Sequence, residues 1–382
     1  MWLSEASKSL TRIRRMIKEI LADLVRIDSV STRSNAEITA YLERRCEALG
    51  LITRRFPYTD EHGLEKINLI ALTQDVQDVE LALVGHTDTV PYDPNWSEAT
   101  NLTERDGKLY GRGSCDTKGF IAAALTALEN TKPSKPLALI FTADEEVGLL
   151  GAKKVAQSKP LRVRYSIVGE PTSLKPIRAG KGYSLAEVLV KGREAHSAYP
   201  ALGASAVFRA ARLINRLESI ATQLKQDHYD AFDPPYTTLN VGLIHGGSAK
   251  NVLAGECRFT LEWRPVPTQR SEHLLDLFNA AIAEEMKSDP DFQCVVDANR
   301  QDTGFETAPE SPLIQLLEQA TGNKSGTVAF GTEAAQMKLL GSEAVVIGPG
   351  DIREAHRTGE FVPVAELERC AEVLRQSIDE LC

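Results

Sequence analysis

The chain has 382 residues, of which 42% are hydrophobic and 25% are charged, and its formal net charge is 44 − 53 = −9. At roughly 150 residues per domain, this length favours two or three domains over one compact core. The acidic balance argues against a nucleic-acid binder, which would carry a basic stripe. No apolar stretch approaches the roughly 18 residues that a membrane span needs, so we expect neither a nucleic acid nor a membrane as partner.

The N-terminal segment and the cysteines favour a cytoplasmic protein. Basic residues at positions 12, 14, 15 and 18 would interrupt the apolar core of a secretory signal. The six cysteines show neither C-x-x-C spacing nor the dense pattern of a disulfide framework. Reduced thiols in the cytoplasm explain this usage best.

The first 180 residues alternate between helical stretches and short apolar runs. Apolar residues at steps of three and four from Leu10 to Ile27 share one face, which predicts an amphipathic helix. Further along, the pattern predicts strands at residues 79–85, 137–142 and 165–169 and helices at 119–129 and 148–157. This alternation indicates an α/β domain, in which polar chemistry collects beyond the carboxyl ends of the strands.

From about residue 180 the rhythm changes. The order becomes β-α-β-β-α-β, that of a small ferredoxin-like α+β domain, with strands at 184–191, 237–244, 252–263 and 292–298 and helices at 204–217 and 271–286. The first rhythm resumes with a helix at 313–320, a strand at 344–348 and a helix at 364–381. The pattern therefore predicts an α/β domain in two halves, 1–179 and 302–382, interrupted by an inserted domain at 180–301.

Five polar clusters lie at the predicted strand ends of the α/β domain. They contain His86 with Asp88, Asp116 in the glycine-rich loop 111–119, Glu145 with Glu146, Glu170, and His356. Taken singly, each has an ordinary explanation, such as a capped turn, a helix N-cap or a solvated acidic turn. Taken together, they bring two imidazoles and several carboxylates to one crevice, a donor set that suits a pair of zinc-class ions.

Such a site has a chemical consequence. Two ions roughly 3.5–4 Å apart clamp the attacking and departing oxygens of a hydrolysis. One carboxylate must then stay free to carry the proton, and the doubled Glu145-Glu146 supplies it. Residues two apart in an extended chain point the same way, so Asp88 can accept the second N–H of His86.

The segments that carry these residues are similar to those of a known superfamily. The motifs at 85–91, 113–119, 144–146 and 169–172, together with His356, resemble the di-zinc aminoacylase and deacylase superfamily of metallopeptidases, which includes succinyl-diaminopimelate desuccinylase and acetylornithine deacetylase. The resemblance runs through essentially the whole chain. It implies a di-zinc exopeptidase-like α/β domain with a central mixed sheet, interrupted by a lid and dimerisation domain.

The resemblance also implies the metal ligands. His86 and Glu170 would hold one zinc ion, with cobalt as an alternative metal. Glu146 and His356 would hold the second ion, and Asp116 would bridge both.

Three catalytic roles follow from the same resemblance. Glu145 corresponds to the general base and acid, and Asp88 to the residue that orients His86. His196, in the inserted domain, resembles a residue that stabilises the oxyanion, often from a partner subunit. Without the resemblance, a lone loop histidine such as His196 is more often a solvated surface group.

Within the superfamily, the segments 106–111, 169–176, 228–232, 235–242 and 244–247 are similar to those of the acetylornithine deacetylases. This branch implies a homodimer that acts on a small-molecule N-acyl amino acid, converting N2-acetyl-L-ornithine to L-ornithine and acetate in arginine biosynthesis. Asn251 and Arg264 resemble positions that bind the substrate carboxylate, although Arg264 could equally form a structural salt bridge. Thr332 and Glu333 lie in a loop that resembles the lining of the acyl and side-chain pocket, where Glu333 could meet a cationic side chain.

Three alternatives remain open at this point. A related enzyme would share the metal centre but act on N-succinyl-diaminopimelate, another N-acyl amino acid or a dipeptide. A catalytically silent binding subunit would use the inserted domain as an assembly surface. A third alternative is an amidase that uses Cys115 as its nucleophile.

Overall fold

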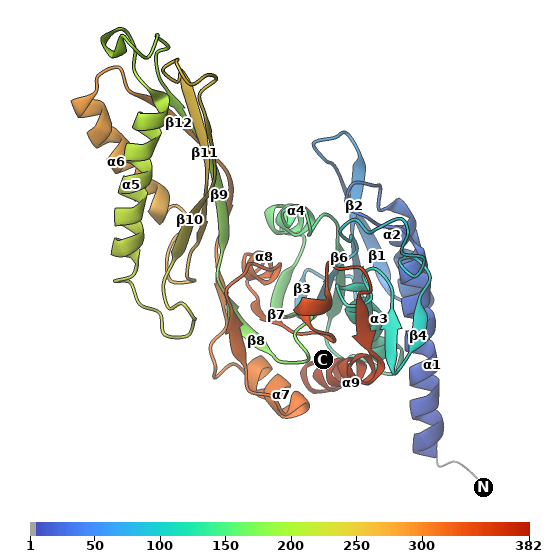
Figure 1. Cartoon of the computed structure of the whole chain (residues 1–382). Helices are drawn as coiled ribbons and strands as arrows, with labels where there is room; N and C mark the ends of the chain where they lie inside the picture. Colours follow the sequence, from blue (N-terminus) through green and yellow to red (C-terminus); the bar gives the residue numbers. More distant parts are fainter. Residues whose placement is uncertain (1–4) are drawn as a thin grey trace. The chain divides into compact units, whose positions relative to one another are not determined.

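A computed structural model describes residues 5–382, with side chains from residue 12 onward, so the side chain of Leu10 lies outside the described part. The chain divides into two compact units (Figure 1). Unit 1 comprises Met1–Arg178, Glu306–Gly326 and Thr332–Cys382, and unit 2 comprises Ala179–Phe305 and Thr327–Gly331.

Unit 1 contains a mixed sheet. Six of its strands follow the order β1 (Ile52–Thr59), β2 (Glu65–Leu72), β6 (Leu137–Thr142), β3 (Asp78–His86), β7 (Arg162–Val168) and β15 (Glu343–Val346), and three short strands continue the sheet beyond β15. The four strands from β6 to β15 are parallel to one another, whereas β1 and β2 add an antiparallel edge. The carboxyl ends of β6, β3, β7 and β15 therefore meet at one edge of the sheet.

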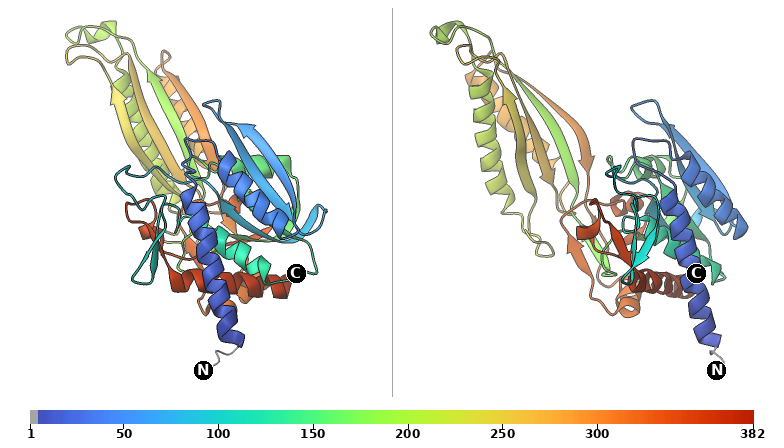
Figure 2. Two further views of the ribbon diagram at one scale, coloured as in Figure 1. Left: turned by 90° about the vertical axis from the view of Figure 1, so that its right-hand side faces the viewer. Right: turned by 45° about the vertical axis from the view of Figure 1, so that its right-hand side comes forward.

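Helices cover both faces of this sheet (Figures 1 and 2). Alternate residues of β3, such as Leu81 and Leu83, share a core with α1 (Glu5–Arg26), α2 (Ala36–Ala48), α3 (Lys118–Glu129), α7 (Pro312–Thr321) and α9 (Val364–Leu381). The intervening Ala82 and Val84 are also buried and point to the opposite face. The helices α4 (Leu150–Ser158) and α8 (Ala334–Lys338) pack against each other and against the sheet.

Short elements complete unit 1. The strands β4 (Thr103–Arg105), β5 (Lys108–Tyr110) and β16 (Phe361–Pro363) form a small antiparallel sheet. The strands β8 (Ile177–Gly180), β13 (Phe305–Glu306) and β14 (Gly326–Val328) lie where the chain passes between the two units. None of the helices in the described part of the chain combines the length and the apolar composition that crossing a membrane requires.

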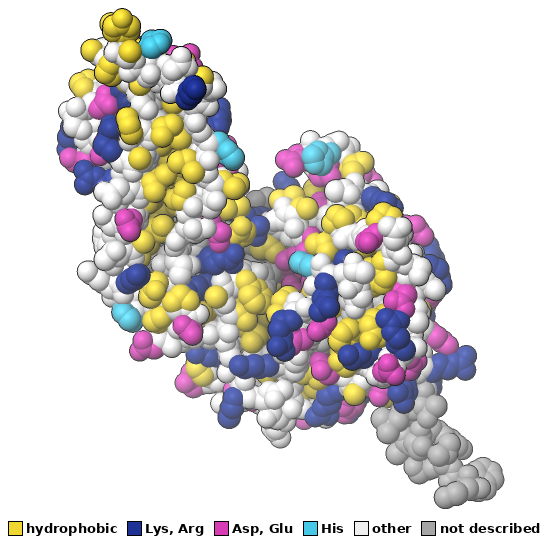
Figure 3. Space-filling model, viewed as in Figure 1, with side chains coloured by type: hydrophobic (Ala, Val, Ile, Leu, Met, Phe, Trp, Pro, Cys, Tyr) yellow, Lys and Arg dark blue, Asp and Glu magenta, His cyan; other side chains and the backbone are white. Residues whose placement is uncertain are grey.

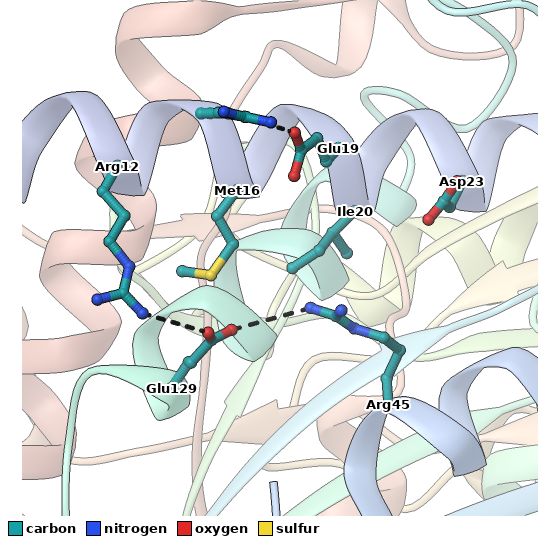
Figure 4. Close-up of a pocket in the computed structure, with 8 residues that line it drawn as sticks. Arg12, Met16, Glu19, Ile20, Asp23, Arg45 and Glu129 are labelled. Carbon is teal, nitrogen blue, oxygen red and sulfur yellow. Dashed lines mark hydrogen bonds and ion pairs between the residues drawn. The ribbon is translucent and has the colours of Figure 1, made fainter. Parts of the chain in front are cut away.

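Charged side chains tie α1 to its neighbours. Glu129, at the end of α3, lies between Arg12 of α1 and Arg45 of α2, at 3.9 and 3.8 Å (Figure 4). Exposed ion pairs of this kind contribute about 0–1 kcal/mol each. The stability of this region therefore depends mainly on the apolar face of α1, where Ile17 is fully buried.

Unit 2 is an antiparallel sheet with two helices on one face (Figure 2). Its elements are β9 (Tyr183–Lys191), the short helix η1 (Pro200–Leu202), α5 (Ala206–Leu224), β10 (Thr238–Gly246), β11 (Glu256–Arg264), α6 (His273–Ser288) and β12 (Gln293–Asp302). The strand order is β10-β11-β9-β12. Every second residue of β9 and of β11 is buried on the side of α5 and α6, whereas β10 is an edge strand with mostly exposed residues.

The mixed α/β sheet and the β-α-β-β-α-β unit confirm the predicted fold class. Some boundaries differ from the prediction. β11 begins at Glu256 rather than at residue 252, because Leu253 instead donates its N–H to the carbonyl oxygen of Ala195 at 2.8 Å. The sequence pattern did not predict α2, or the hairpin of β1 and β2.

Candidate metal centre

Most candidate residues lie where the carboxyl ends of the parallel strands meet. His86 is the last residue of β3, and Glu145 and Glu146 follow closely after β6. Glu170 follows β7, and His356 follows β15 by way of the short helix η2 (Ile352–Glu354). The parallel arrangement thus gathers side chains that are far apart in the sequence.

Asp116, in the loop before α3, lies between the two imidazoles. Its Oδ1 is 3.0 Å from His86 Nε2, and its Oδ2 is 3.1 Å from His356 Nε2. Two donors on one tetrahedral zinc ion, each about 2.0–2.1 Å from the metal, lie about 3.3 Å apart. The spacing therefore fits a carboxylate that gives one oxygen to each of two ions.

Glu146 extends this cluster. Its Oε2 is 3.0 Å from His356 Nε2. One ligand atom each of His86, Asp116 and Glu146 lies within 4.8 Å of the others. These imidazole nitrogens and carboxylate oxygens form a donor set typical of zinc-class ions.

The cluster holds more carboxylates than imidazoles, and its Asp116 and Glu170 are buried. Burial raises the pKa of Glu145 well above its usual range despite the nearby His86, and burial and Asp116 do the same for Glu170. At Asp116 burial acts in the same direction, but hydrogen bonds with His356 and His86 hold the pKa of this carboxyl below its usual range. Bound cations would supply the missing positive charge, so these residues fit a dinuclear metal site.

The carboxylate of Asp88 has different partners from the one that we expected. His86 Nδ1 donates to the main-chain carbonyl oxygen of Asp88 at 3.0 Å, whereas the carboxylate Oδ1 is 3.7 Å away. The carboxylate instead accepts the main-chain N–H groups of Glu145 at 3.0 Å and Glu146 at 3.3 Å. Asp88 thus holds His86 through its backbone and the acidic loop through its side chain.

A second buried carboxylate supports the loop that carries Asp116, and the sequence analysis missed it. Glu360 accepts the main-chain N–H groups of Cys115 and Asp116 at 3.0 and 3.1 Å and pairs with Arg112 at 2.6 Å. Between 244 and 248 positions separate Glu360 from these partners. No local spacing in the sequence could have indicated these contacts.

Cys115 is not suited to nucleophilic catalysis. Its buried thiol donates to the carbonyl oxygen of Asp351 at 3.6 Å. Burial, followed by the nearby carboxylate of Glu360, raises the pKa of this thiol. A nucleophilic cysteine needs the opposite shift, so these contacts argue against the cysteine-based alternative.

Thr332 and Glu333 lie at the start of α8, in unit 1, and both are buried. Glu333 Oε1 accepts the hydroxyl hydrogen of Thr142 at 2.6 Å. Burial raises the pKa of Glu333 to about 7, and its charge acts on Glu145 and Glu170. Glu333 therefore belongs to the same buried acidic cluster.

His196, Asn251 and Arg264 belong to unit 2. His196 and Asn251 are exposed and close together, because Ser197 donates its N–H to the carbonyl oxygen of Asn251 at 3.0 Å. Arg264 is half-buried and pairs with Glu262 at 2.9 Å. Within unit 2 the structure thus brings His196 and Asn251 together, and it shows Arg264 in an ion pair.

The sequence is similar to proteins of one established family. The sequence profile of peptidase family M20/M25/M40 matches residues 82–380. An acetylornithine deacetylase from Myxococcus xanthus is 50% identical over 370 residues, which cover 96% of this chain and 97% of that protein.

Solved structures share the fold. A tripeptidase from Staphylococcus aureus has a TM-score of 0.75 at 24% identity, over 96% of this chain and 98% of that one. A dinuclear metal-binding M20 peptidase from Bacillus subtilis has a TM-score of 0.67 at 13% identity, over 97% of this chain and 99% of that one. The chain therefore belongs to peptidase family M20/M25/M40 and is a hydrolase of amide bonds.

Proposed function

We propose that the chain is a dinuclear-metal amidohydrolase that converts N2-acetyl-L-ornithine to L-ornithine and acetate, a step of arginine biosynthesis. The observation that carries the reaction is the position of Asp116 between two imidazoles, with the half-buried Glu145 in the same cluster. The choice of substrate is supported by the 50% identity to the acetylornithine deacetylase of Myxococcus xanthus.

The proposed cofactors are two zinc ions per chain, with cobalt as a substitute. His86 and Glu170 would hold one ion, and Glu146 and His356 would hold the other. Asp116 would bridge both, in keeping with its contacts to both imidazoles. When bound, such ions polarise the acyl carbonyl and lower the pKa of water at the site.

Glu145 is the proposed general base and acid. Its pKa, raised by burial, gives the carboxylate a higher affinity for a proton than an exposed glutamate has. It takes a proton from the attacking water and returns it to the amine nitrogen when the C–N bond breaks. Asp88 supports this role by accepting the main-chain N–H of Glu145.

The substrate-binding assignments rest on the family resemblance. His196 would stabilise the oxyanion, from its own or the partner subunit. Asn251 and Arg264 would bind the substrate carboxylate, for which a guanidinium offers a bidentate fork. Thr332 would line the acyl pocket.

The proposal includes a homodimer formed through unit 2. Phe208 of α5 is 71% exposed, and Leu243 and Ile244 of the edge strand β10 are 59% and 50% exposed. Figure 3 shows hydrophobic side chains gathered on the visible face of unit 2. An edge strand with exposed apolar side chains is a template for pairing with a second copy of the chain.

The proposed location is the cytoplasm. All six cysteines are free, as expected for a reducing compartment. The proposed partner is a small-molecule N-acyl amino acid, with no role for a nucleic acid or a membrane.

The Glu145→Gln variant tests the general base. We expect kcat to fall by about a hundred- to ten-thousandfold, because the amide cannot accept the proton. The variant should keep two metal ions per chain by elemental analysis. The exposed Glu61→Gln serves as the matched control and should retain wild-type kcat. Full activity of Glu145→Gln would refute the role.

Metal removal tests the dinuclear centre. A chelator should abolish hydrolysis, and zinc or cobalt should restore it, because the carboxylate cluster needs the compensating cations. A thiol-blocking reagent should leave the activity unchanged, because the thiol of Cys115 is buried. Hydrolysis by the metal-free chain would contradict the proposal.

A substrate panel tests the specificity. We expect kcat/KM for N2-acetyl-L-ornithine to exceed that for N-succinyl-diaminopimelate or a dipeptide by about tenfold or more. The succinyl group carries an additional carboxylate that needs a cationic partner, which an acetyl group does not need. A preference for another compound would identify a sibling deacylase, whereas no hydrolysis by the metal-loaded protein would favour a binding subunit.

The Leu243→Glu variant tests the dimer. We expect light scattering to give twice 41.8 kDa for the wild type and a shift toward 41.8 kDa for the variant, because a buried charge without a partner weakens association. Leu339→Glu is the matched control, since Leu339 is 58% exposed but lies in unit 1. A dimer that tolerates Leu243→Glu as well as Leu339→Glu would exclude an interface at β10.

A further inference from the structure

A closed ring of hydrogen bonds holds the loop that carries Glu145. Lys66 Nζ donates to Asp144 Oδ1 at 2.7 Å and to the main-chain carbonyl oxygen of Ser31. Ser31 Oγ donates to Asp88 Oδ2 at 2.7 Å, and Asp88 Oδ1 accepts the main-chain N–H of Glu145 at 3.0 Å. The covalent link between Asp144 and Glu145 closes this ring. We call Ser31, Lys66, Asp88 and Asp144 the Lys66 ring.

Lys66 occupies a position that a lysine rarely takes. Its side chain, on β2, is 1% exposed. A buried ammonium group is tolerated only when it is paired and fully hydrogen-bonded. The carboxylate of Asp144 supplies the pairing charge, and the carbonyl oxygens of Ser31 and Arg33 accept from the same nitrogen, the latter at 2.9 Å. Each of the three N–H donors of the ammonium group thus has an acceptor.

Asp144 is held at both carboxylate oxygens. Lys66 binds Oδ1, and the hydroxyl of Tyr58 donates to Oδ2 at 2.8 Å. The backbone of Asp144 has a φ of 55°, in the left-handed region that residues other than glycine seldom adopt. Such a conformation persists when the surrounding contacts determine it. The side chain of Asp144 therefore helps to set the direction in which the chain enters Glu145.

The loop is anchored on its other side by Asp88, whose carboxylate accepts the N–H groups of Glu145 and Glu146. With the backbone held at both ends, the Glu145 carboxylate can move only through its own side-chain torsions. A displacement of about 1 Å of a reacting group can cost about a hundredfold in rate. The contacts of Lys66 thus bear directly on where the proton acceptor lies.

We propose that Lys66 is a positioning residue for the general base, acting through Asp144 on the placement of the Glu145 carboxylate. Lys66 donates to Asp144 in the acidic loop and to the carbonyl oxygens of Ser31 and Arg33, and Asp60 Oδ2 lies 3.9 Å from its ammonium nitrogen. None of these partners is a proposed metal ligand, so the connection from Lys66 to the reaction runs through the acidic loop. The inference rests on the proposed function, because it needs Glu145 as the group that carries the proton.

Hydrogen exchange tests the anchoring without requiring activity. In Lys66→Met, the amides of Glu145 and Glu146 should exchange at least about tenfold faster than in the wild type, because the ring that protects them is open. The conservative Lys66→Arg should restore most of the protection. Residues 137–142 of β6 are the internal reference, whose exchange should stay unchanged. Equal exchange of the Glu145 and Glu146 amides in wild type and Lys66→Met would overturn the inference.

A double-mutant cycle separates positioning from general stability. In the wild-type background, Lys66→Met should lower kcat about ten- to a hundredfold, with KM and metal content nearly unchanged. In the Glu145→Gln background, the same change should alter the residual kcat less than about twofold, because the group that Lys66 positions is gone. A reduction by the same factor in both backgrounds would show a merely structural role and overturn the inference.

Two further variants keep this test decisive. If Lys66→Met folds poorly, Lys66→Met with Asp144→Asn removes both charges of the 2.7 Å ion pair together, so that Asp144 is not left as a buried charge without its partner. The matched control is Lys181→Met, a buried lysine of unit 2 that donates to the carbonyl oxygens of Pro234 and Tyr236. Any effect of Lys181→Met should be the same factor with and without Glu145.

The two proposals fail in different ways. If the metal-loaded wild type hydrolyses no N-acyl amino acid but Lys66→Met still loses protection at Glu145 and Glu146, the proposed function is refuted while the anchoring by Lys66 stands. If the wild type is active but the cycle shows equal factors, the proposed function stands and the positioning role of Lys66 is refuted.

Discussion

Buried carboxylates need compensating positive charge, and this requirement organises the centre of unit 1. The buried cations Lys66 and Arg112 each pair with a supporting carboxylate, Asp144 and Glu360 respectively. Neither cation is therefore available to balance the negative charge of the central cluster around Asp116, whose neighbouring bases are two imidazoles. Burial raises the pKa of Glu145 and Glu170 in this cluster, as expected of acidic groups whose charge the chain itself does not balance. The proposed pair of metal ions would balance this negative charge.

The two loops that carry the central acidic residues are held in the same way, each by one buried carboxylate that binds its main-chain N–H groups. Asp88 accepts two consecutive main-chain N–H groups, those of Glu145 and Glu146, and Glu360 accepts those of Cys115 and Asp116. Hydrogen bonds to an ionised carboxylate are stronger than neutral ones. Each supporting carboxylate therefore fixes the backbone of a loop, so that the reactive side chains project from rigid positions.

The inserted unit obeys simpler rules. Its β9 and β11 bury alternate residues against two helices, a pattern with a period of two that the sequence displays directly. The edge strand β10 does not follow this pattern, because Leu243 and Ile244 are exposed although they are apolar. Exposed apolar residues on a strand edge are a liability for an isolated chain, and a second copy of the chain would cover them.

The sequence by itself determined the fold class and the set of candidate ligands. Apolar periodicity is local, and motifs such as Asp144-Glu145-Glu146 are contiguous, so both can be recognised in the sequence alone. The tertiary structure alone decided which groups support the loops: Glu360 for Asp116, Lys66 for Asp144, and the backbone rather than the carboxylate of Asp88 for His86. These contacts join residues on different strands and loops or depend on a side-chain torsion. A pattern of residue types along the chain cannot specify such contacts, because the partners come within hydrogen-bonding distance only when the strands and loops pack together.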